Sequence, residues 1–221
     1  MSVSQSWQQL KEVFFRLNPE APRLFRAGAT RGERSRLQQF FPELPESIYQ
    51  LLGTNNGEER RSYGEMMFGF RLLDIDGMLH IQEAWNQIAD EQDGDENNEI
   101  EGVVFPEDAG KADYFSRQYL VFADNGAGDS LVMDLAPGAK GTPGQVTHVG
   151  KYVIDRYVIA DGLESFFDLL ASLHLDPRLK MNWAEGRISE ATWDGDRNTM
   201  VTGLFTLLPL LYEEGRLYQA K

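Results

Sequence analysis

The sequence predicts an α+β fold. We expect N-terminal helices, a central and mainly antiparallel sheet, a C-terminal helix packed on that sheet, and a helical C-terminal extension. Two observations predict this arrangement. Apolar residues recur at helical spacing before residue 60 and again over 163–173, whereas the short apolar runs between 119 and 159 are separated by turn-forming residues. Helices at both ends of an antiparallel run of strands are typical of an α+β domain.

Three helices are expected in the N-terminal part. The first spans residues 6–17, where apolar residues recur at helical spacing. A short second helix covers Glu33–Phe40. The third follows Pro45, which suits the first turn of a helix, and ends at Asn55-Asn56-Gly57, where Asn and Gly tolerate left-handed cap geometry.

The next segment is predicted to run from strand to helix to loop. Phe68–Ile75 is an apolar run that we expect to form a strand, and Asp76-Gly77 is expected to form a turn. Met78–Ala89 carries apolar residues at helical spacing. Asp90–Glu101 is rich in Asp, Glu, Asn and Gly, and we expect an acidic loop there.

A run of strands follows the acidic loop. The glycines of 124–129 allow a tight hairpin between the expected strands Tyr119–Ala123 and Ser130–Leu135. The expected strands are Val103–Pro106, Tyr119–Ala123, Ser130–Leu135, Val146–Val149 and Tyr152–Ile159.

The C-terminal part is expected to be helical. Leu163–Leu173 has the apolar spacing of a helix, and Thr199–Leu217 has the character of one more, despite its glycine and proline. We therefore divide the chain into one domain over 1–176 and a helical extension over 177–221, which we expect to pack on the same domain.

The charge balance indicates the kind of partner. Lys and Arg number 21 against 35 Asp and Glu, which gives a net charge of −14. Such a surface repels phosphate backbones and anionic lipids, so we expect no nucleic-acid or membrane partner. It attracts a basic protein, although many acidic chains are acidic only for solubility. The absence of cysteine fits a reducing cytoplasm, and no secretory signal or membrane span is recognised.

No residue is assigned a catalytic, cofactor-binding or metal-binding role. P-loop, nucleophile-elbow and H-E-x-x-H motifs are absent. Asp93 and Asp95 resemble the beginning of a calcium loop, but Asn98 stands where that loop requires glycine. A basic cluster is expected to pair with acidic residues elsewhere on the surface; its members are Arg23, Arg26, Arg31, Arg34 and Arg36.

Three segments in this order resemble the SUKH superfamily, which includes yeast Smi/Knr cell-wall regulators and bacterial toxin-immunity proteins. Leu44–Leu52 with Asn55-Asn56-Gly57 resembles its Leu-Pro helix and Asn-Gly cap. Phe122–Asp134 resembles its hairpin, and Ser165–Leu170 its closing helix. The resemblance implies a protein-binding module without enzymatic activity.

The first hypothesis is a cytoplasmic immunity protein, monomeric or weakly dimeric, that masks the active surface of a basic toxin, for instance a nuclease. A regulatory or scaffold role of the Smi/Knr kind is the alternative, and an enzyme with an unrecognised carboxylate site is a third. For a partner-binding role we single out the acidic residues of the loop and hairpin: Asp90, Glu91, Asp93, Asp95, Glu96, Glu99, Glu101, Asp124 and Asp129.

Overall fold

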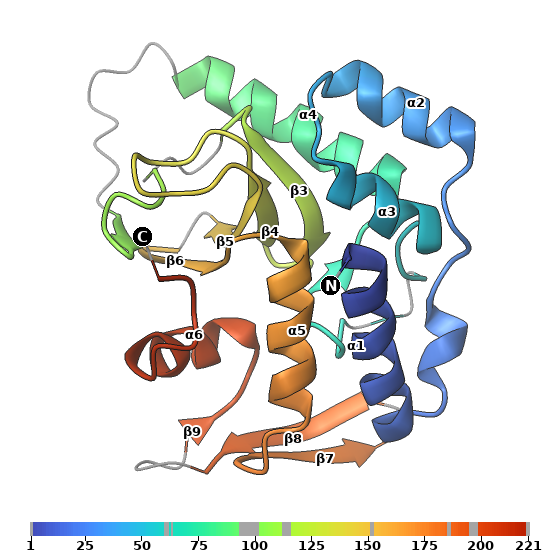
Figure 1. Ribbon diagram of the computed structural model, residues 1–221, viewed down its shortest axis with the longest axis vertical. Helices are drawn as coiled ribbons and strands as arrows, with labels where there is room; N and C mark the ends of the chain where they lie inside the picture. Colours follow the sequence, from blue (N-terminus) through green and yellow to red (C-terminus); the bar gives the residue numbers. More distant parts are fainter. Residues whose placement is uncertain are drawn as a thin grey trace.

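The computed structural model describes residues 2–59, 62, 64–92, 102–111, 116–150, 153–184, 187–194 and 199–219. The fold is α+β, as the sequence predicts. A six-stranded mixed sheet and a three-stranded antiparallel sheet are combined with helices that flank the larger sheet (Figure 1).

The larger sheet has the strand order β1-β3-β4-β5-β6-β2, and only the β2–β6 pair is parallel. Almost every residue of its four central strands is buried, because apolar side chains cover both faces. The strands of this sheet are β1 (Arg71–Leu72), β2 (Val103–Phe105), β3 (Tyr119–Asp124), β4 (Asp129–Asp134), β5 (Gln145–Gly150) and β6 (Asp155–Ala160).

Helix α5 packs against this sheet, and α1 lies side by side with α5 (Figure 1). Trp7 of α1 contacts Phe167 of α5 with ring centroids 4.8 Å apart, and Phe166 of α5 contacts Phe122 of β3. The helices are α1 (Val3–Leu17), α2 (Arg31–Phe40), α3 (Glu46–Thr54), α4 (Ile75–Gln92), α5 (Leu163–His174) and α6 (Leu204–Glu213), with a 3-10 turn at Ala21–Leu24. None of the helices in the described ranges combines the length and apolar character that crossing a bilayer requires.

The predicted strand at Phe68–Ile75 is mostly wrong. Only Arg71 and Leu72 pair in the sheet, and α4 begins at Ile75, so Asp76-Gly77 is the first turn of a helix. The Asp74 carboxylate accepts a hydrogen bond from the Gly77 amide over 2.8 Å, which is the bond of a helix N-cap. A capping aspartate therefore lies in what reads as an apolar strand.

The predicted helical extension is confirmed only in part. Helix α6 is present but shorter than Thr199–Leu217, because Thr199 and Met200 belong to a strand. The small sheet consists of β7 (Leu179–Ala184), β8 (Arg187–Trp193) and β9 (Thr199–Met200). The reason is a period of two: alternate residues of β7 face the core while their neighbours face solvent.

The small sheet packs across the ends of α1 and α5 (Figure 1). Trp183 of β7 contacts Phe14 of α1 with ring centroids 5.8 Å apart. At the start of β7, Asp176 accepts hydrogen bonds from Arg178 and Arg216, and chiefly the Arg178 bond lowers the pKa of Asp176 to about 2. The Arg178 guanidinium also lies 4.4 Å from the Trp193 ring. Apolar residues before and after 177 share one core, and the division at 177 stays a prediction.

The predicted pairing of the basic cluster is confirmed for three of its members. Arg23 pairs with Glu20, Arg26 with Asp74, and Arg36 with Asp76. The last two pairs tie the α2 region to the first turn of α4. Their exposure limits each to about 0–1 kcal/mol, so they orient these elements more than they stabilise them.

Candidate protein-binding groove

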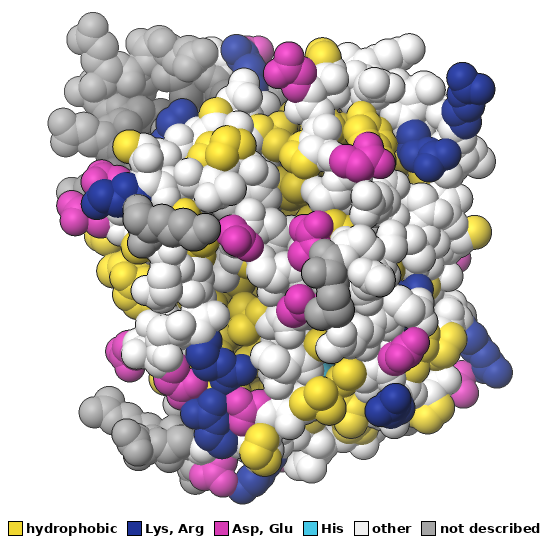
Figure 2. All heavy atoms as spheres, in the orientation of Figure 1, with side chains coloured by type: hydrophobic (Ala, Val, Ile, Leu, Met, Phe, Trp, Pro, Cys, Tyr) yellow, Lys and Arg dark blue, Asp and Glu magenta, His cyan; other side chains and the backbone are white. Residues whose placement is uncertain are grey.

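Little of the predicted acidic surface lies within the described residues. Asp90 is exposed in the last turn of α4 and forms an ion pair with Arg117. Glu91 belongs to α4. Outside the described residues lie Asp93, Asp95, Glu96, Glu99 and Glu101. On the face that Figure 2 shows, Asp and Glu are interspersed with Lys and Arg and do not form one acidic area.

The hairpin aspartates hold the turn between β3 and β4. Asp124 accepts a hydrogen bond from the Gly126 amide (2.7 Å), and Asp129 accepts one from Asn125 Nδ2 (3.0 Å). Burial is the main cause that raises the pKa of Asp124. These hydrogen bonds give both aspartates a structural role in the turn, and partner binding by the same residues stays a prediction.

The structure does not gather the predicted acidic residues into one site. Arg117, the partner of Asp90, precedes β3, whereas Asp124 ends it, so the length of the strand separates them. Asp124 and Asp129, in contrast, lie together at the turn between β3 and β4. The described residues also hold no group of three or more His, Asp or Glu that is arranged to bind a metal ion.

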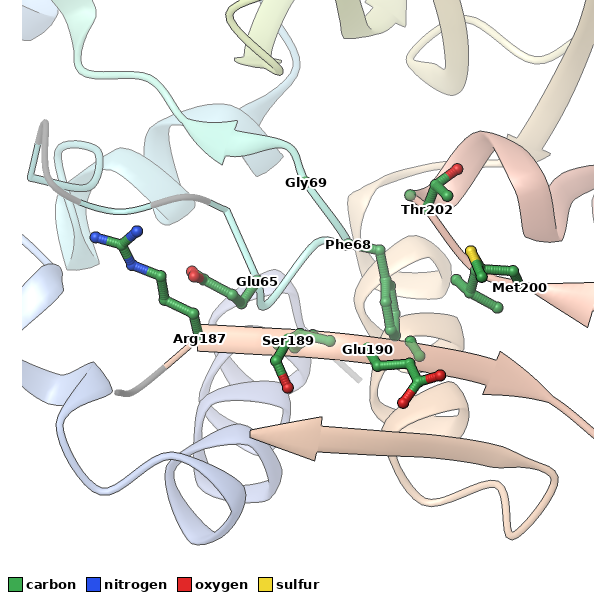
Figure 3. A pocket seen from close by; sticks show the side chains of 12 residues that line it. Glu65, Phe68, Gly69, Arg187, Ser189, Glu190, Met200 and Thr202 are labelled. Carbon is green, nitrogen blue, oxygen red and sulfur yellow. The ribbon is translucent and has the colours of Figure 1, made fainter. Parts of the chain in front are cut away.

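A groove lies between the loop 64–70 and the small sheet (Figure 3). Its volume is about 750 Å³, within the usual range for binding pockets. The loop supplies one wall, and β8, β9 and the start of α6 supply the other. The lining residues are Glu65, Phe68, Gly69, Arg187–Ala191 and Met200–Gly203.

The loop wall is held in an unusual backbone conformation. Phe68 has a φ of 50°, a left-handed value that is rare for an aromatic residue, and Gly69 follows with 99°. Three contacts hold this wall. The Phe68 carbonyl accepts a bond from the Leu204 amide (2.9 Å), the Gly69 amide donates to the Gly64 carbonyl (2.9 Å), and the Phe68 ring stacks on His174. The groove wall is therefore fixed by α5 and α6.

His174 fixes the same loop from beneath. Its Nε2 lies 2.9 Å from the Met66 carbonyl, and its ring stacks on Phe68 with centroids 4.6 Å apart. Burial lowers the pKa of His174 to about 4, so the imidazole is neutral at pH 7 and Nε2 donates to the carbonyl. His174 thus has a packing role, and the same holds for His148, which is buried against Phe70.

Exposed apolar side chains stand at the mouth of the groove. Met200 is 65% exposed and Phe205 is 43% exposed. The Phe205 ring lies against Gly203, where a Cβ atom would come within 2.7 Å of it. Gly203, which lines the groove, therefore leaves room for the Phe205 ring beside it. Exposed apolar residues beside a hollow are typical of sites that bind another molecule.

Charged residues line the other end of the groove. In Figure 3 the Glu65 carboxylate points toward the Arg187 side chain, which crosses from the opposite wall. Glu190 lies farther along β8, is exposed, and accepts a hydrogen bond from Asn182 Nδ2 (3.1 Å). The groove thus has an apolar end at Met200 and a polar end with both charge signs.

The groove residues do not appear among the sites predicted from the sequence. The missed signal is the alternation Leu179, Met181, Trp183, in which apolar residues are separated by single residues that face outward. That pattern predicts a strand at the position of β7, which pairs with the β8 residues that line the groove. The positive φ of Phe68 has no comparable sequence signal, because tertiary contacts impose it.

A smaller depression of about 440 Å³ lies between the segment 40–43 and α4. It includes Arg117, the ion-pair partner of Asp90. Asp90 therefore borders this depression through its ion pair with Arg117, and it does not line the larger groove.

Similarity to known proteins covers most of the chain. The SMI1 / KNR4 family (SUKH-1) model matches residues 28–169. The "Cell wall biosynthesis/cell cycle regulator smi1" of Schizosaccharomyces pombe is 26% identical over 182 residues, 76% of this chain and 35% of that protein. The "KNR4/SMI1 homolog" of Yarrowia lipolytica is 34% identical over 104 residues, 47% of this chain and 14% of that protein. The chain thus spans well under half the length of either relative.

The family match ends before the small sheet begins. One groove wall, the loop 64–70, lies within residues 28–169, whereas β8 and β9 lie beyond them. The groove is thus built jointly from the matched part of the chain and from the segment that follows it.

Proposed function

The chain belongs to the SMI1 / KNR4 family (SUKH-1), and from that premise we propose that it is a non-enzymatic, cytoplasmic module that binds another protein. The observation that carries this proposal is the groove, with Met200 and Phe205 exposed at its mouth. Both side chains would lose contact with water in a complex. Burial of apolar area is the main favourable term in protein association.

The net charge of the chain supports a basic partner. At −14, the chain attracts a cationic surface over several ångströms and speeds its encounter, most strongly at low salt. Because both charge signs are interspersed on the face in Figure 2, the attraction is a property of the whole molecule. The groove then provides the short-range contacts.

The first form of the proposal is an immunity protein that neutralises a toxin by masking its active surface. A nuclease toxin needs a cationic face to hold phosphate, and an acidic protein of complementary shape occupies such a face. The test is co-expression with the toxin encoded by the adjacent gene, in a host that the toxin kills. Restored growth together with a co-purified complex supports this form, and continued killing without a complex overturns it.

The second form is a regulatory or scaffold protein, which the similarity to the cell wall biosynthesis and cell cycle regulator of fission yeast favours. Its test is expression of the chain in Schizosaccharomyces pombe cells that lack smi1. Restoration of normal resistance to cell-wall stress supports the regulatory form. An unchanged stress phenotype, with the chain present at a comparable level, contradicts it.

A further inference from the structure

One edge of β8 lacks a strand partner over part of its length. β7 pairs with β8 along its whole span, but on the other side β9 pairs only with Thr192 and Trp193. One more bond follows, from the Val201 amide to the Ala191 carbonyl (2.8 Å), and the chain then turns away into α6. Within the described ranges, Ile188–Glu190 therefore have a strand neighbour on the β7 side alone.

The groove runs along this edge. Five consecutive β8 residues, 187–191, line it, and the loop 64–70 faces them from the other side (Figure 3). The groove also continues the line of β9, whose residue Met200 and the following Val201 line its other end. An extended chain placed there would lie where a longer β9 would lie.

We propose that an extended segment of a basic partner protein binds in this groove as an added strand on the edge of β8. The proposal rests on the proposed function and gives its mode of binding. Strand addition satisfies backbone donors and acceptors on both chains and leaves side-chain pockets to select the sequence. The fixed loop wall keeps the groove open, so little ordering accompanies binding.

The side chains of the groove define the segment. A residue facing the Met200 end meets Phe68 and Val201 and is apolar. A residue facing the middle of β8 meets the exposed carboxylate of Glu190 and is Lys or Arg. The added strand is short, because a bulge at Ser189 interrupts the regular register of β8.

Charge argues against a second copy of the chain as the occupant. Two copies at −14 each repel one another at low salt, whereas a basic segment is attracted. Exposed sheet edges are also sites of self-association, which natural proteins resist with charges and bulges. Glu190 and the Ser189 bulge fit that resistance and leave a complementary basic segment as the favoured occupant.

The test selects a displayed library of random 12-residue peptides against the full chain. We expect the selected peptides to combine apolar and basic residues and to bind at least tenfold more weakly to the Met200→Lys and Glu190→Lys variants. The matched control is Ile154→Lys, at a residue that is 61% exposed and does not line the groove. It should change binding less than twofold.

Two further measurements test the strand geometry itself. N-methylation of single peptide amides should weaken binding at least tenfold at alternate positions, and bound peptide should slow hydrogen exchange of the amides in 188–190. Because hydrogen exchange is measured on the unaltered chain, this test remains valid if a variant fails to fold. Uniform effects of N-methylation, or no protection in 188–190, overturn the strand model.

Binding of the cognate partner to the groove variants and to the unaltered chain separates the binding mode from the proposed function. If the cognate partner binds the Met200→Lys and Glu190→Lys variants as tightly as the unaltered chain, the groove is not the site, although the chain still binds protein. If no partner binds the unaltered chain, both proposals fall.

Discussion

At the residue scale, the helix-ending Asn-Asn-Gly sequence does more than end α3. Asn55 Oδ1 accepts hydrogen bonds from Trp7 Nε1 (2.9 Å) and Lys11 Nζ (3.0 Å), and Asn55 Nδ2 donates to the Arg26 carbonyl (2.7 Å). Burial disfavours the charged form of Lys11 and so lowers its pKa. The hydrogen bond to Asn55 Oδ1 stabilises the ammonium group at this site. One amide thus joins α1, α3 and the chain between them.

Replacement of Asn55 by Ala should therefore destabilise the fold. The change leaves the Trp7 indole N–H without its acceptor in the core and removes a bond to buried Lys11. We expect a loss of about 2–4 kcal/mol in the free energy of unfolding, measured by urea denaturation. Gln38→Ala, at an exposed site on α2, is the control and should change stability by less than about 0.5 kcal/mol. An equal loss in both variants would contradict the assigned role.

Glu58 is a buried carboxyl that links Ser62 to β1. It accepts hydrogen bonds from the Ser62 hydroxyl and the Leu72 amide. Burial raises the pKa of Glu58 to about 7, whereas burial lowers the pKa values of His148 and His174 to about 4. These groups oppose one another in the pH dependence of stability.

The Glu58→Gln variant should show a steeper pH dependence of stability than the unaltered chain. Between pH 4.5 and 6.5, unfolding releases the Glu58 proton, so this group lowers stability as pH rises, whereas each buried histidine takes up a proton on unfolding and raises it. Each group changes the free energy of unfolding by about 1.4 kcal/mol per pH unit. In the unaltered chain the two histidines outweigh Glu58, so stability rises by about 1.4 kcal/mol per pH unit. In Glu58→Gln only the histidines remain, so stability rises by about 2.8 kcal/mol per pH unit. Urea denaturation at several pH values measures this. Equal slopes in both proteins would contradict the assignment.

At the element scale, the predictable parts are those with a local signal. Helices α1 and α5 follow from apolar spacing, α3 follows from its Pro45 start and its Asn-Asn-Gly end, and the β3–β4 hairpin follows from its glycines. The end of the predicted Phe68 strand was missed because the Asp74 cap, a single residue, outweighs the apolar run. The small sheet was missed because its alternation is short and irregular at the Ser189 bulge. The groove depends on both missed segments.

The loop 64–70 gives a paired test of how the groove wall is held. Gly64 and Gly69 both have positive φ. A Cβ atom at Gly64 would lie 2.3 Å from the Phe70 carbonyl carbon, whereas a Cβ atom at Gly69 would have no neighbouring atom within 4 Å. Gly69→Ala should cost about 1 kcal/mol from conformation alone, and Gly64→Ala about 3 kcal/mol or more, because the backbone must also move. Thermal unfolding of both variants checks this, and equal costs would refute the close approach.

At the scale of the whole molecule, charge and shape contribute at different distances. The net charge of −14 acts before contact, and the groove acts after it. The association rate with a basic partner should therefore fall on the order of tenfold between about 0.02 and 0.5 M salt, while the dissociation rate changes less. Stopped-flow mixing measures both rates. A salt-independent association rate would show that charge does not guide the encounter.

The most direct measurement of the central claim is site-specific photo-crosslinking in the cells that produce this chain. Met200 is replaced by p-benzoylphenylalanine, and in a parallel control Ile154, which is 61% exposed, is replaced in the same way. A protein-binding module that uses the groove predicts a discrete protein adduct from position 200 that position 154 does not form. No protein adduct at position 200, or the same adduct at both positions, would contradict it.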